Sequence, residues 1–238
     1  MNAAIIGATG LIGRLLLQKL IDSAAYNKIL VFGRREATFA ASLATEVIFI
    51  SCQLSQLPTV TVGEKIDHAF CCLGTTIKQA GSQQAFIAVD KTAVIDFVQL
   101  CHASTNLVVT ALGADAQSST FYNRIKGETE LALALASTLA TNEQAKGAIA
   151  KLILFQPSLL LGERSQHRPL ESLGQSVFNL VSPLFIGPLK RYQPISANSV
   201  ASAMLTMALN PKKLYPVNST NSTMAERQVI RVHNETML

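Results

Sequence analysis

Three glycines near the start of the chain constrain its fold more than any other feature. In the stretch GATGLIG, Gly7, Gly10 and Gly13 lie three residues apart. Residues 2–6 are apolar enough for a short buried strand, and apolar side chains recur at helical spacing from residue 11. The glycines therefore lie between a predicted strand and a predicted helix. A plain strand-to-helix turn needs one glycine, so three at fixed spacing favour a turn that binds a ligand.

Each glycine has a physical role at this place. Gly7 allows a sharp turn, Gly10 lets the backbone approach a pyrophosphate without a Cβ, and Gly13 lets the helix lie close to the strand. The first helical turn has free N–H groups, and the helix dipole favours an anion beside them. The stretch therefore predicts a dinucleotide-binding turn.

Apolar strands and helical segments alternate along the first two thirds of the chain. The further buried strands are predicted at residues 28–33, 46–51, 67–74, 106–113 and 151–157, and the main helices at about 82–102 and 121–139. This alternation predicts an α/β fold, a doubly wound parallel sheet with helices on both faces. Ligands of such sheets bind at the carboxyl ends of the strands.

The length of 238 residues suits one domain, 1–238, with a sheet core over 1–157. From residue 158 the pattern changes to Pro-rich and Gly-rich connections around helical pieces near 170–181 and 198–209. We expect 158–238 to form a small substrate-side lobe over the cofactor crevice. Residues 217–227 are polar enough for a loop, and the segment VIRVHN after them is a candidate for a last strand.

Composition excludes several other classes of protein. Hydrophobic residues make up 49% of the chain and charged residues 15%, which argues against disorder. The net charge of +5 includes no basic run longer than two residues, so we expect no nucleic-acid partner. The uncharged segment 172–189 contains Gln, Asn, Pro and Gly, so an apolar pocket wall is favoured over a membrane span. Arg14 and Lys19 interrupt the apolar N-terminus, which predicts a cytoplasmic protein rather than a signal peptide.

The four cysteines and four histidines predict no metal site. The cysteines show no CxxC spacing, and we interpret them as reduced core thiols. The histidines are scattered along the chain without metal-ligand spacing.

The second predicted strand ends in Gly33-Arg34-Arg35. In doubly wound sheets an acidic residue at this place holds the ribose 2′-hydroxyl of NAD. Two guanidinium groups suit a 2′-phosphate instead, through bidentate charge-assisted hydrogen bonds. The pair therefore favours NADP(H) as the cofactor, with a solvated arginine pair as the alternative.

Tyr122 and Lys126 lie four residues apart, at the start of the helix that follows the fifth strand. Side chains at this spacing share one face of a helix. Because a nearby ammonium group stabilises a phenolate, Tyr122 is a candidate general acid or base. A Tyr-x-x-x-Lys pair alone is a weak signal, and its position in the fold is what strengthens it.

Together these features resemble the short-chain dehydrogenase/reductase superfamily, in its atypical, extended-like branch. More closely, the chain resembles the Tat-interacting-protein-like oxidoreductases, from residue 3 to about residue 205. The segments that carry this resemblance are CCLGTTIKQAG (71–81), FIAVD (86–90), LGAD (112–115), RIKGETE (124–130), the RP at 168–169 and YQPISANSVASAM (192–204). The resemblance implies a Rossmann fold and an NADP(H)-dependent oxidoreductase that acts on a small or lipid-like carbonyl compound or the corresponding alcohol.

The resemblance also implies roles for individual positions. Tyr122 would donate or accept the proton, Lys126 would hold the nicotinamide ribose, and Asp90 stands where extended members often carry a helix asparagine, with a role in proton relay. The remaining implied cofactor contacts are Gly7, Thr9, Gly10, Leu11, Ile12 and Gly13 at the pyrophosphate, Arg34 and Arg35 at the 2′-phosphate, Gln53, Leu73 and Gly74 on the adenosine side, and Leu160 and Arg164 near the nicotinamide.

Three positions depart from the pattern of the superfamily. Where a serine usually orients the substrate carbonyl after the fifth strand, this chain has Thr110-Ala111. Thr110 is our first candidate for that role, and Ser118 or Ser119 comes next. Gln53 replaces a common aspartate, and Gln156-Pro157 replaces a common Arg-Pro.

Two functions of different classes follow. The Tyr122/Lys126 pair favours an oxidoreductase, whereas Thr110-Ala111 favours an NADPH-binding sensor or protein-interaction module with little catalysis. A sugar-nucleotide epimerase would need a longer substrate lobe than 158–238. We predict the oxidoreductase, with protein partners left open.

Overall fold

The computed structural model describes residues 1–139, 151–161, 187–214 and 229–238. Seven strands form one sheet in the order β3-β2-β1-β4-β5-β6-β9, and every neighbouring pair is parallel. The strands are β1 (Asn2–Ile6), β2 (Lys28–Gly33), β3 (Glu46–Ser51), β4 (His68–Cys71), β5 (Thr105–Val109), β6 (Leu152–Gln156) and β9 (Val229–His233). The predicted doubly wound parallel sheet is confirmed.

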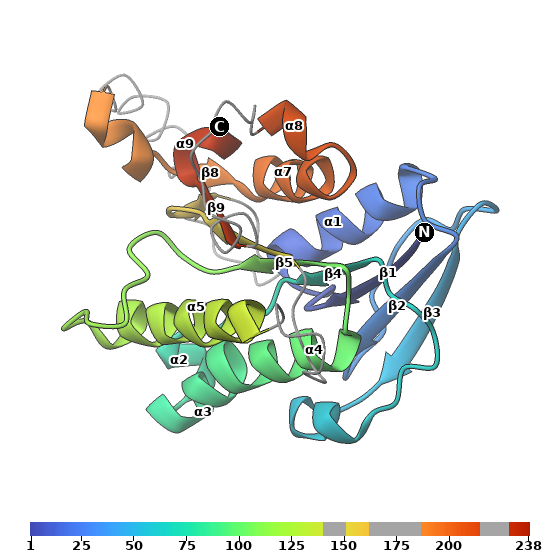
Figure 1. The fold of residues 1–238 in the computed structure, drawn as a ribbon, viewed down its shortest axis with the longest axis horizontal. Helices are drawn as coiled ribbons and strands as arrows, with labels where there is room; N and C mark the ends of the chain where they lie inside the picture. The colour runs from blue at the N-terminus through green and yellow to red at the C-terminus, as the bar shows by residue number, and fades with distance from the viewer. Residues whose placement is uncertain (140–150, 162–186, 215–228) are drawn as a thin grey trace, which may run out of the picture.

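Helices cover both faces of the sheet (Figure 1). On one face α1 (Leu11–Asp22) packs beside α7 (Ala197–Leu209), and on the other face lie α4 (Ala93–Cys101) and α5 (Phe121–Leu139). Shorter elements follow the strands or close the chain: α2 (Ile77–Ala80), α3 (Gln83–Ile87), α8 (Pro211–Leu214), α9 (Asn234–Met237), the helical turns η1 (Leu54–Thr59), η2 (Ala88–Thr92) and η4 (Gly187–Tyr192), and a two-stranded sheet of β7 (Leu160–Leu161) and β8 (Ile195–Ser196).

Successive side chains of each strand point to opposite faces of the sheet and so pack alternately into two apolar cores. Ala3 and Ile5 of β1 belong to the core under α1 and α7. Ala4 and Ile6 belong to the core under α4. A strand buried on both faces needs an uninterrupted apolar run, which is the signal that predicted it.

The predicted helix over 82–102 is divided in the structure. It begins as α3, passes through the π-helical turn η2 and continues as α4. Ser82 caps its start, where its Oγ accepts the N–H of Ala85 at 3.1 Å. A π-helical turn shifts the register of the helix. Asp90 lies within this turn with its side chain buried, and it pairs with Lys126 of α5.

Part of the predicted C-terminal lobe belongs to the main layers. Helix α7 covers α1, and β9 extends the sheet beside β6. Four predicted features lie outside the described residues: the helical piece near 170–181, Arg164, the polar loop 217–227, and the uncharged segment 172–189 except for its last three residues, which belong to η4. In the part of the chain that the structure describes, no helix is both long and apolar enough to cross a membrane.

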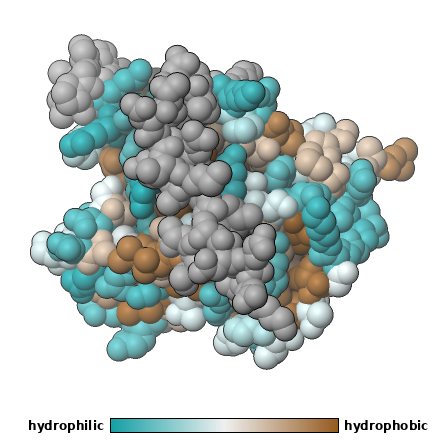
Figure 2. Space-filling view, viewed as in Figure 1, coloured by the Kyte–Doolittle hydropathy of each residue, from teal (hydrophilic) through white to brown (hydrophobic). Residues whose placement is uncertain are grey.

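Much of the described surface in the view of Figure 2 is hydrophilic, with apolar groups over α5 and others on the opposite side of the view. Two leucines of this helix, Leu131 and Leu135, are exposed and lie four residues apart on it. All four cysteines are free, and Cys52, Cys71 and Cys101 are buried, as expected for core thiols.

Candidate functional site

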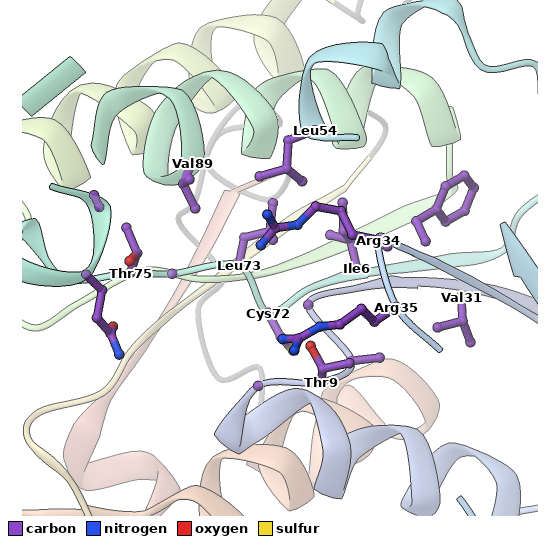
Figure 3. A pocket seen from close by; sticks show the side chains of 18 of the residues that line it. Ile6, Thr9, Val31, Arg34, Arg35, Leu54, Cys72, Leu73, Thr75 and Val89 are labelled. Carbon is purple, nitrogen blue, oxygen red and sulfur yellow. The ribbon is translucent and has the colours of Figure 1, made fainter. Parts of the chain in front are cut away.

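A cleft of about 350 Å³ opens at the carboxyl ends of β1, β2 and β4 (Figure 3). The register places these ends level, because Ile6 of β1 pairs with Phe32 of β2 and with Cys71 of β4. The chain order of the sheet reverses between β1 and β4. Doubly wound sheets bind their ligands at this reversal, and the cleft lies where the glycine turn leaves β1.

The glycine turn has the geometry that its sequence predicts. Gly7 has a φ of +80°, and a Cβ there would lie 2.6 Å from the carbonyl carbon of Cys72. A Cβ on Gly13 would lie 2.1 Å from the carbonyl oxygen of Gly7, so α1 can approach the turn only with glycine at this position. Gly10 precedes the first residue of α1 and lines the cleft.

The start of α1 favours an anionic ligand. Its first turn contains no acidic residue. Helix N-terminal N–H groups without intrahelical partners attract phosphate, and the helix dipole adds to this attraction. Thr9 and Gly10, which lead into the helix, are exposed at the cleft.

Arg34 and Arg35 follow the end of β2, are exposed and line the same cleft. In Figure 3 the Arg34 side chain extends on the side of Leu54 and Leu73, and the Arg35 side chain extends on the side of Thr9. No carboxylate is among the described residues that line the cleft. The cleft is therefore positively charged, which suits a ligand with several phosphate groups.

The apolar walls of the cleft include residues that sequence reasoning missed. Leu54 of η1 and Val89 of η2 line it together with the predicted Leu73 and Gly74. Gln53 is exposed and is not among the lining residues, and its N–H donates to Oε1 of Gln56 at 2.8 Å. Leu54 could not have been predicted as a lining residue, because a leucine at the start of a short helical turn is common and carries no signal of a binding site.

Thiol chemistry does not fit this site. Burial raises the pKa of the Cys71 thiol to about 12, and burial also raises the pKa of the Cys72 thiol well above its ordinary value. Both thiols stay protonated near neutral pH, so neither supplies a thiolate nucleophile.

Tyr122 and Lys126 lie on α5, beside the cleft rather than among its lining residues. The Tyr122 ring packs against the buried Phe86 ring, with centroids 5.7 Å apart. Lys126 is 4% exposed, and its Nζ lies 2.6 Å from Oδ1 of Asp90. Oδ2 of Asp90 accepts the N–H of Thr75 at 2.9 Å, and Thr75 lines the cleft. Asp90 thus connects the lysine of α5 to the cleft wall.

Thr110 differs from the expectation that it orients a substrate. It is buried, and its hydroxyl lies 2.7 Å from Oε1 of Glu130 and 3.2 Å from the carbonyl oxygen of Phe155. Glu130 is itself buried and also accepts from Gln156 and Arg231. Because a hydroxyl has one hydrogen to donate, the Thr110 donor is committed to the interior.

The remaining candidates lie near the entrance to α5 or on the small sheet. Ser118 precedes α5, where its Oγ accepts the N–H of Thr120 at 3.2 Å, and Ser119 beside it is exposed. Leu160 lies in β7, paired with Ile195 of β8. The structure brings Gly7, Thr9 and Gly10 into one cleft with the arginine pair, Leu73 and Gly74. The other predicted residues that the structure describes are not among the lining residues: Leu11, Ile12, Gly13, Gln53, Thr110, Tyr122, Lys126 and Leu160.

Comparisons with known proteins agree with this architecture. No family model matches the chain. Protein HTATIP2 of Rattus norvegicus is 32% identical over 182 residues, which cover 73% of this chain and 69% of the relative. Protein FMP52, mitochondrial, of Eremothecium gossypii is 28% identical over 224 residues, 90% of this chain and 91% of the relative. Among solved structures, a short-chain type dehydrogenase/reductase from Mycobacterium ulcerans has a TM-score of 0.63 at 13% identity, covering 99% of this chain and 89% of that one.

Proposed function

This chain belongs to the Tat-interacting-protein-like branch of the atypical short-chain dehydrogenases/reductases, and from that premise we propose that it is an NADP(H)-dependent oxidoreductase. Its substrate would be a small carbonyl compound or the corresponding alcohol. One observation carries the proposal: an arginine pair and a helix N-terminus share a cleft whose described lining has no carboxylate.

The residues of the cleft fit NADP(H) group by group. The backbone of Thr9 to Ile12 would hold the pyrophosphate, since Thr9 and Gly10 line the cleft and lead into the first turn of α1, which begins at Leu11. Arg34 and Arg35 would pair with the 2′-phosphate. Leu54 and Leu73 would pack against the adenosine. The reduced cofactor supplies a hydride when it is bound.

The protein's own contribution to the chemistry would come from α5. Tyr122 would give its phenolic proton to the carbonyl oxygen as the carbonyl is reduced, and would take it back in the reverse direction. Contact with Phe86 holds the ring of Tyr122. Lys126 would stabilise the phenolate and hold the ribose hydroxyl groups.

Calorimetric titration with NADPH and NADH tests the cofactor assignment. In the double variant Arg34→Ala/Arg35→Ala, NADPH affinity should fall about 10- to 150-fold, the equivalent of about 1.5 to 3 kcal/mol for a lost charge-assisted pair. NADH affinity should barely change, because NADH has no 2′-phosphate. Arg191→Ala is a matched control outside the cleft. Equal losses for both cofactors would mean that the arginines support only the fold.

The environment of Thr110 favours a second candidate, an NADPH-binding sensor with little catalysis. The Thr110 hydroxyl is committed to Glu130, and Ala111 next to it has no hydroxyl. A sensor would show NADPH-dependent protection from proteolysis or hydrogen exchange, without NADPH oxidation by a panel of carbonyl compounds. Turnover of any compound in the panel would favour the enzyme. Cellular fractionation tests the predicted cytoplasmic location, since the related FMP52 is named mitochondrial.

A further inference from the structure

The C-terminal helix α9 lies at the carboxyl edge of the sheet. Gln156, the last residue of β6, pairs in register with His233, the last residue of β9, so the residues that follow them leave the sheet at the same edge. Asn234 begins α9 directly after β9, and α9 lies against β9 and η4 (Figure 1). The end of the chain therefore reaches the edge of the sheet at which the cofactor cleft opens.

The side chain of Asn234 joins two separate loops. It is fully buried, its Oδ1 accepts the N–H of Ser158 at 3.0 Å, and its Nδ2 donates to the carbonyl oxygen of Gln193 at 2.7 Å. The hydroxyl of Ser158 donates to the same carbonyl oxygen. Burial of an amide is costly unless its polar ends are hydrogen-bonded, and both ends of this amide bind loop backbone.

The two loops continue side by side beyond this connection. The N–H of Ile195 donates to the carbonyl oxygen of Leu159 at 3.0 Å, and β7 then pairs with β8. The amide of Asn234 makes the first cross-connection after β6. It therefore sets the direction in which residues 157–160 leave the sheet.

Attachment of the C-terminus to the rest of the fold does not depend on this amide. β9 pairs with β6 along its whole length, Arg231 forms an ion pair with Glu130, and the side chains of Val232 and Met237 lie in the apolar core. These contacts already anchor the last ten residues. Anchoring alone therefore does not account for a buried amide whose two partners are loop backbone groups.

The loop after β6 borders the second half of the site. In doubly wound sheets each half of the sheet takes one nucleotide of a dinucleotide, on either side of the point where the strand order reverses. The arginine pair after β2 assigns the adenosine half to the side of β1 and β2. The sheet order places β5 and β6 on the other side of β4, so the nicotinamide half would extend toward their carboxyl ends.

We propose that Asn234 is a positioning residue for the nicotinamide half of the cofactor site. It acts through the backbone of residues 157–160, which it holds in place from the C-terminal end of the chain. The inference rests on the proposed function, because it takes the orientation of NADP(H) from it. Loss of the amide would displace the loop after β6 and leave the glycine turn and the arginine pair unchanged.

The experiment compares two ligands by calorimetry on the full chain. NADPH occupies both halves of the site, whereas adenosine 2′,5′-bisphosphate contains the adenosine and the 2′-phosphate and has no nicotinamide. Asn234→Ala should weaken NADPH binding about 5- to 10-fold, the scale of a lost hydrogen bond between neutral groups. It should change the affinity for the bisphosphate less than about two-fold, since that ligand is bound on the side of β1 and β2. A purely structural role would not separate the two ligands.

Asn106→Ala is the matched control. Asn106 is also a buried asparagine whose Nδ2 donates to a backbone carbonyl, that of Ala103 at 3.3 Å. It lies near the amino end of β5, at the opposite edge of the sheet from the site. The control variant should lower the melting temperature and leave the ratio of the two affinities unchanged.

Each other outcome has a definite meaning. If wild-type protein binds neither ligand, the proposed function fails and this inference fails with it. If wild-type protein binds both and Asn234→Ala weakens both equally, the amide supports the fold as a whole and the inference alone is overturned. Wild-type affinity for NADPH in Asn234→Ala overturns it as well.

A second variant covers the case in which Asn234→Ala does not fold. Asn234→Asp keeps the size of the side chain and an acceptor for the N–H of Ser158, and it replaces the donor to the Gln193 carbonyl by an oxygen. It should weaken NADPH binding and spare the bisphosphate. A ratio of the two affinities equal to that of the wild type would contradict the assignment.

Discussion

Replacing Thr110 by valine separates a structural role of its hydroxyl from a catalytic one. The substitution keeps the β-branched shape and removes the group that lies 2.7 Å from Oε1 of the buried Glu130. Its alternative acceptor, the carbonyl oxygen of Phe155, is 3.2 Å away and competes for the same hydrogen. Both acceptors lie in the interior, so the substitution should affect stability and spare the chemistry.

The loss of stability in Thr110→Val depends on the hydrogen bonds that remain to the Glu130 carboxylate. After the substitution its carboxylate still accepts from Nε2 of Gln156 at 2.8 Å and from Nε of Arg231 at 3.1 Å. It is therefore not left unpaired, and the loss should lie near the lower end for a hydrogen bond to a charged group, about 1.5 kcal/mol. In a chain of this length that corresponds to a fall of about 3 to 6 °C in melting temperature.

Thermal unfolding and steady-state kinetics on the same preparations provide the test. We expect Thr110→Val to lower the melting temperature and to leave kcat within about three-fold. Thr45→Val is a matched control, because Thr45 is also buried but donates to a neutral acceptor, the carbonyl oxygen of Tyr26 at 2.9 Å. Its loss should be smaller, about 0.5 to 1.5 kcal/mol. A loss of about 100-fold or more in kcat without a change in stability would refute this reasoning, since that is the scale of a missing oxyanion donor.

Further predictions concern the glycine turn, the acid/base residue and acid stability. Gly13→Ala should lower the NADPH affinity measured by calorimetry by about 10-fold or more, because the new Cβ would lie 2.1 Å from a backbone oxygen. Gly63→Ala is the control, since Gly63 has open space around it, and it should leave the NADPH affinity unchanged. Tyr122→Phe should keep cofactor affinity and lose about 100-fold or more in kcat, as measured by NADPH oxidation, and a wild-type rate would contradict the acid/base role. Burial lowers the pKa of His68, which hydrogen-bonds Tyr26 at 2.8 Å, so the unfolded chain binds a proton first as the pH falls. The stability from neutral His68 is present above about pH 6.5 and is lost below it at up to about 1.4 kcal/mol per pH unit. His68→Gln should flatten this dependence in urea unfolding at pH 7 and pH 5, and an unchanged slope would assign it to other groups.

The sheet was predictable because its strands are short apolar runs, and the five central ones, β1, β2, β4, β5 and β6, are largely buried. Strands such as β2 (Lys28–Gly33) and β3 (Glu46–Ser51) are continuous apolar runs, and the predicted bounds match the observed ones. The end of β4 was predicted too long, because Cys72 and Leu73 continue the apolar run into the cleft wall. The end of β5 was also predicted too long: the strand ends at Val109, although the N–H groups of Thr110 and Leu112 still donate to carbonyl groups near the end of β6 and just after it. The π-helical turn η2 was not predicted, since its cause is tertiary: Asp90 turns inward to meet Lys126 from a segment that is distant in sequence.

The phosphate side of the candidate site was more predictable than the catalytic side. Gly7, Gly10 and Gly13 act through the local backbone, so their spacing in the sequence is enough to predict the turn and the close approach of α1 to it. Thr110 and Gln53 were assigned by their positions after a strand. The Thr110 hydroxyl instead donates to Glu130, and the Gln53 side chain caps η1 by accepting a backbone N–H of its first turn. The position of a residue after a strand does not determine where its side chain points. A buried carboxylate such as that of Glu130 can accept the hydrogen bond that the sequence would assign to a substrate.

Helix α5 presents two buried charges one turn apart, and each has a partner from a different part of the chain. Lys126 pairs with Asp90, and Glu130 pairs with Arg231 of β9 while accepting the Thr110 hydroxyl. The Thr110 hydroxyl donates to Glu130, and Ala111 has no hydroxyl, so we expect neither residue to contact the carbonyl group of a substrate. Polarisation of a carbonyl would then depend on Tyr122, whose ring packs against Phe86. An enzyme built in this way would derive most of its transition-state stabilisation from one phenol. The factor by which Tyr122→Phe lowers kcat measures the contribution of that phenol.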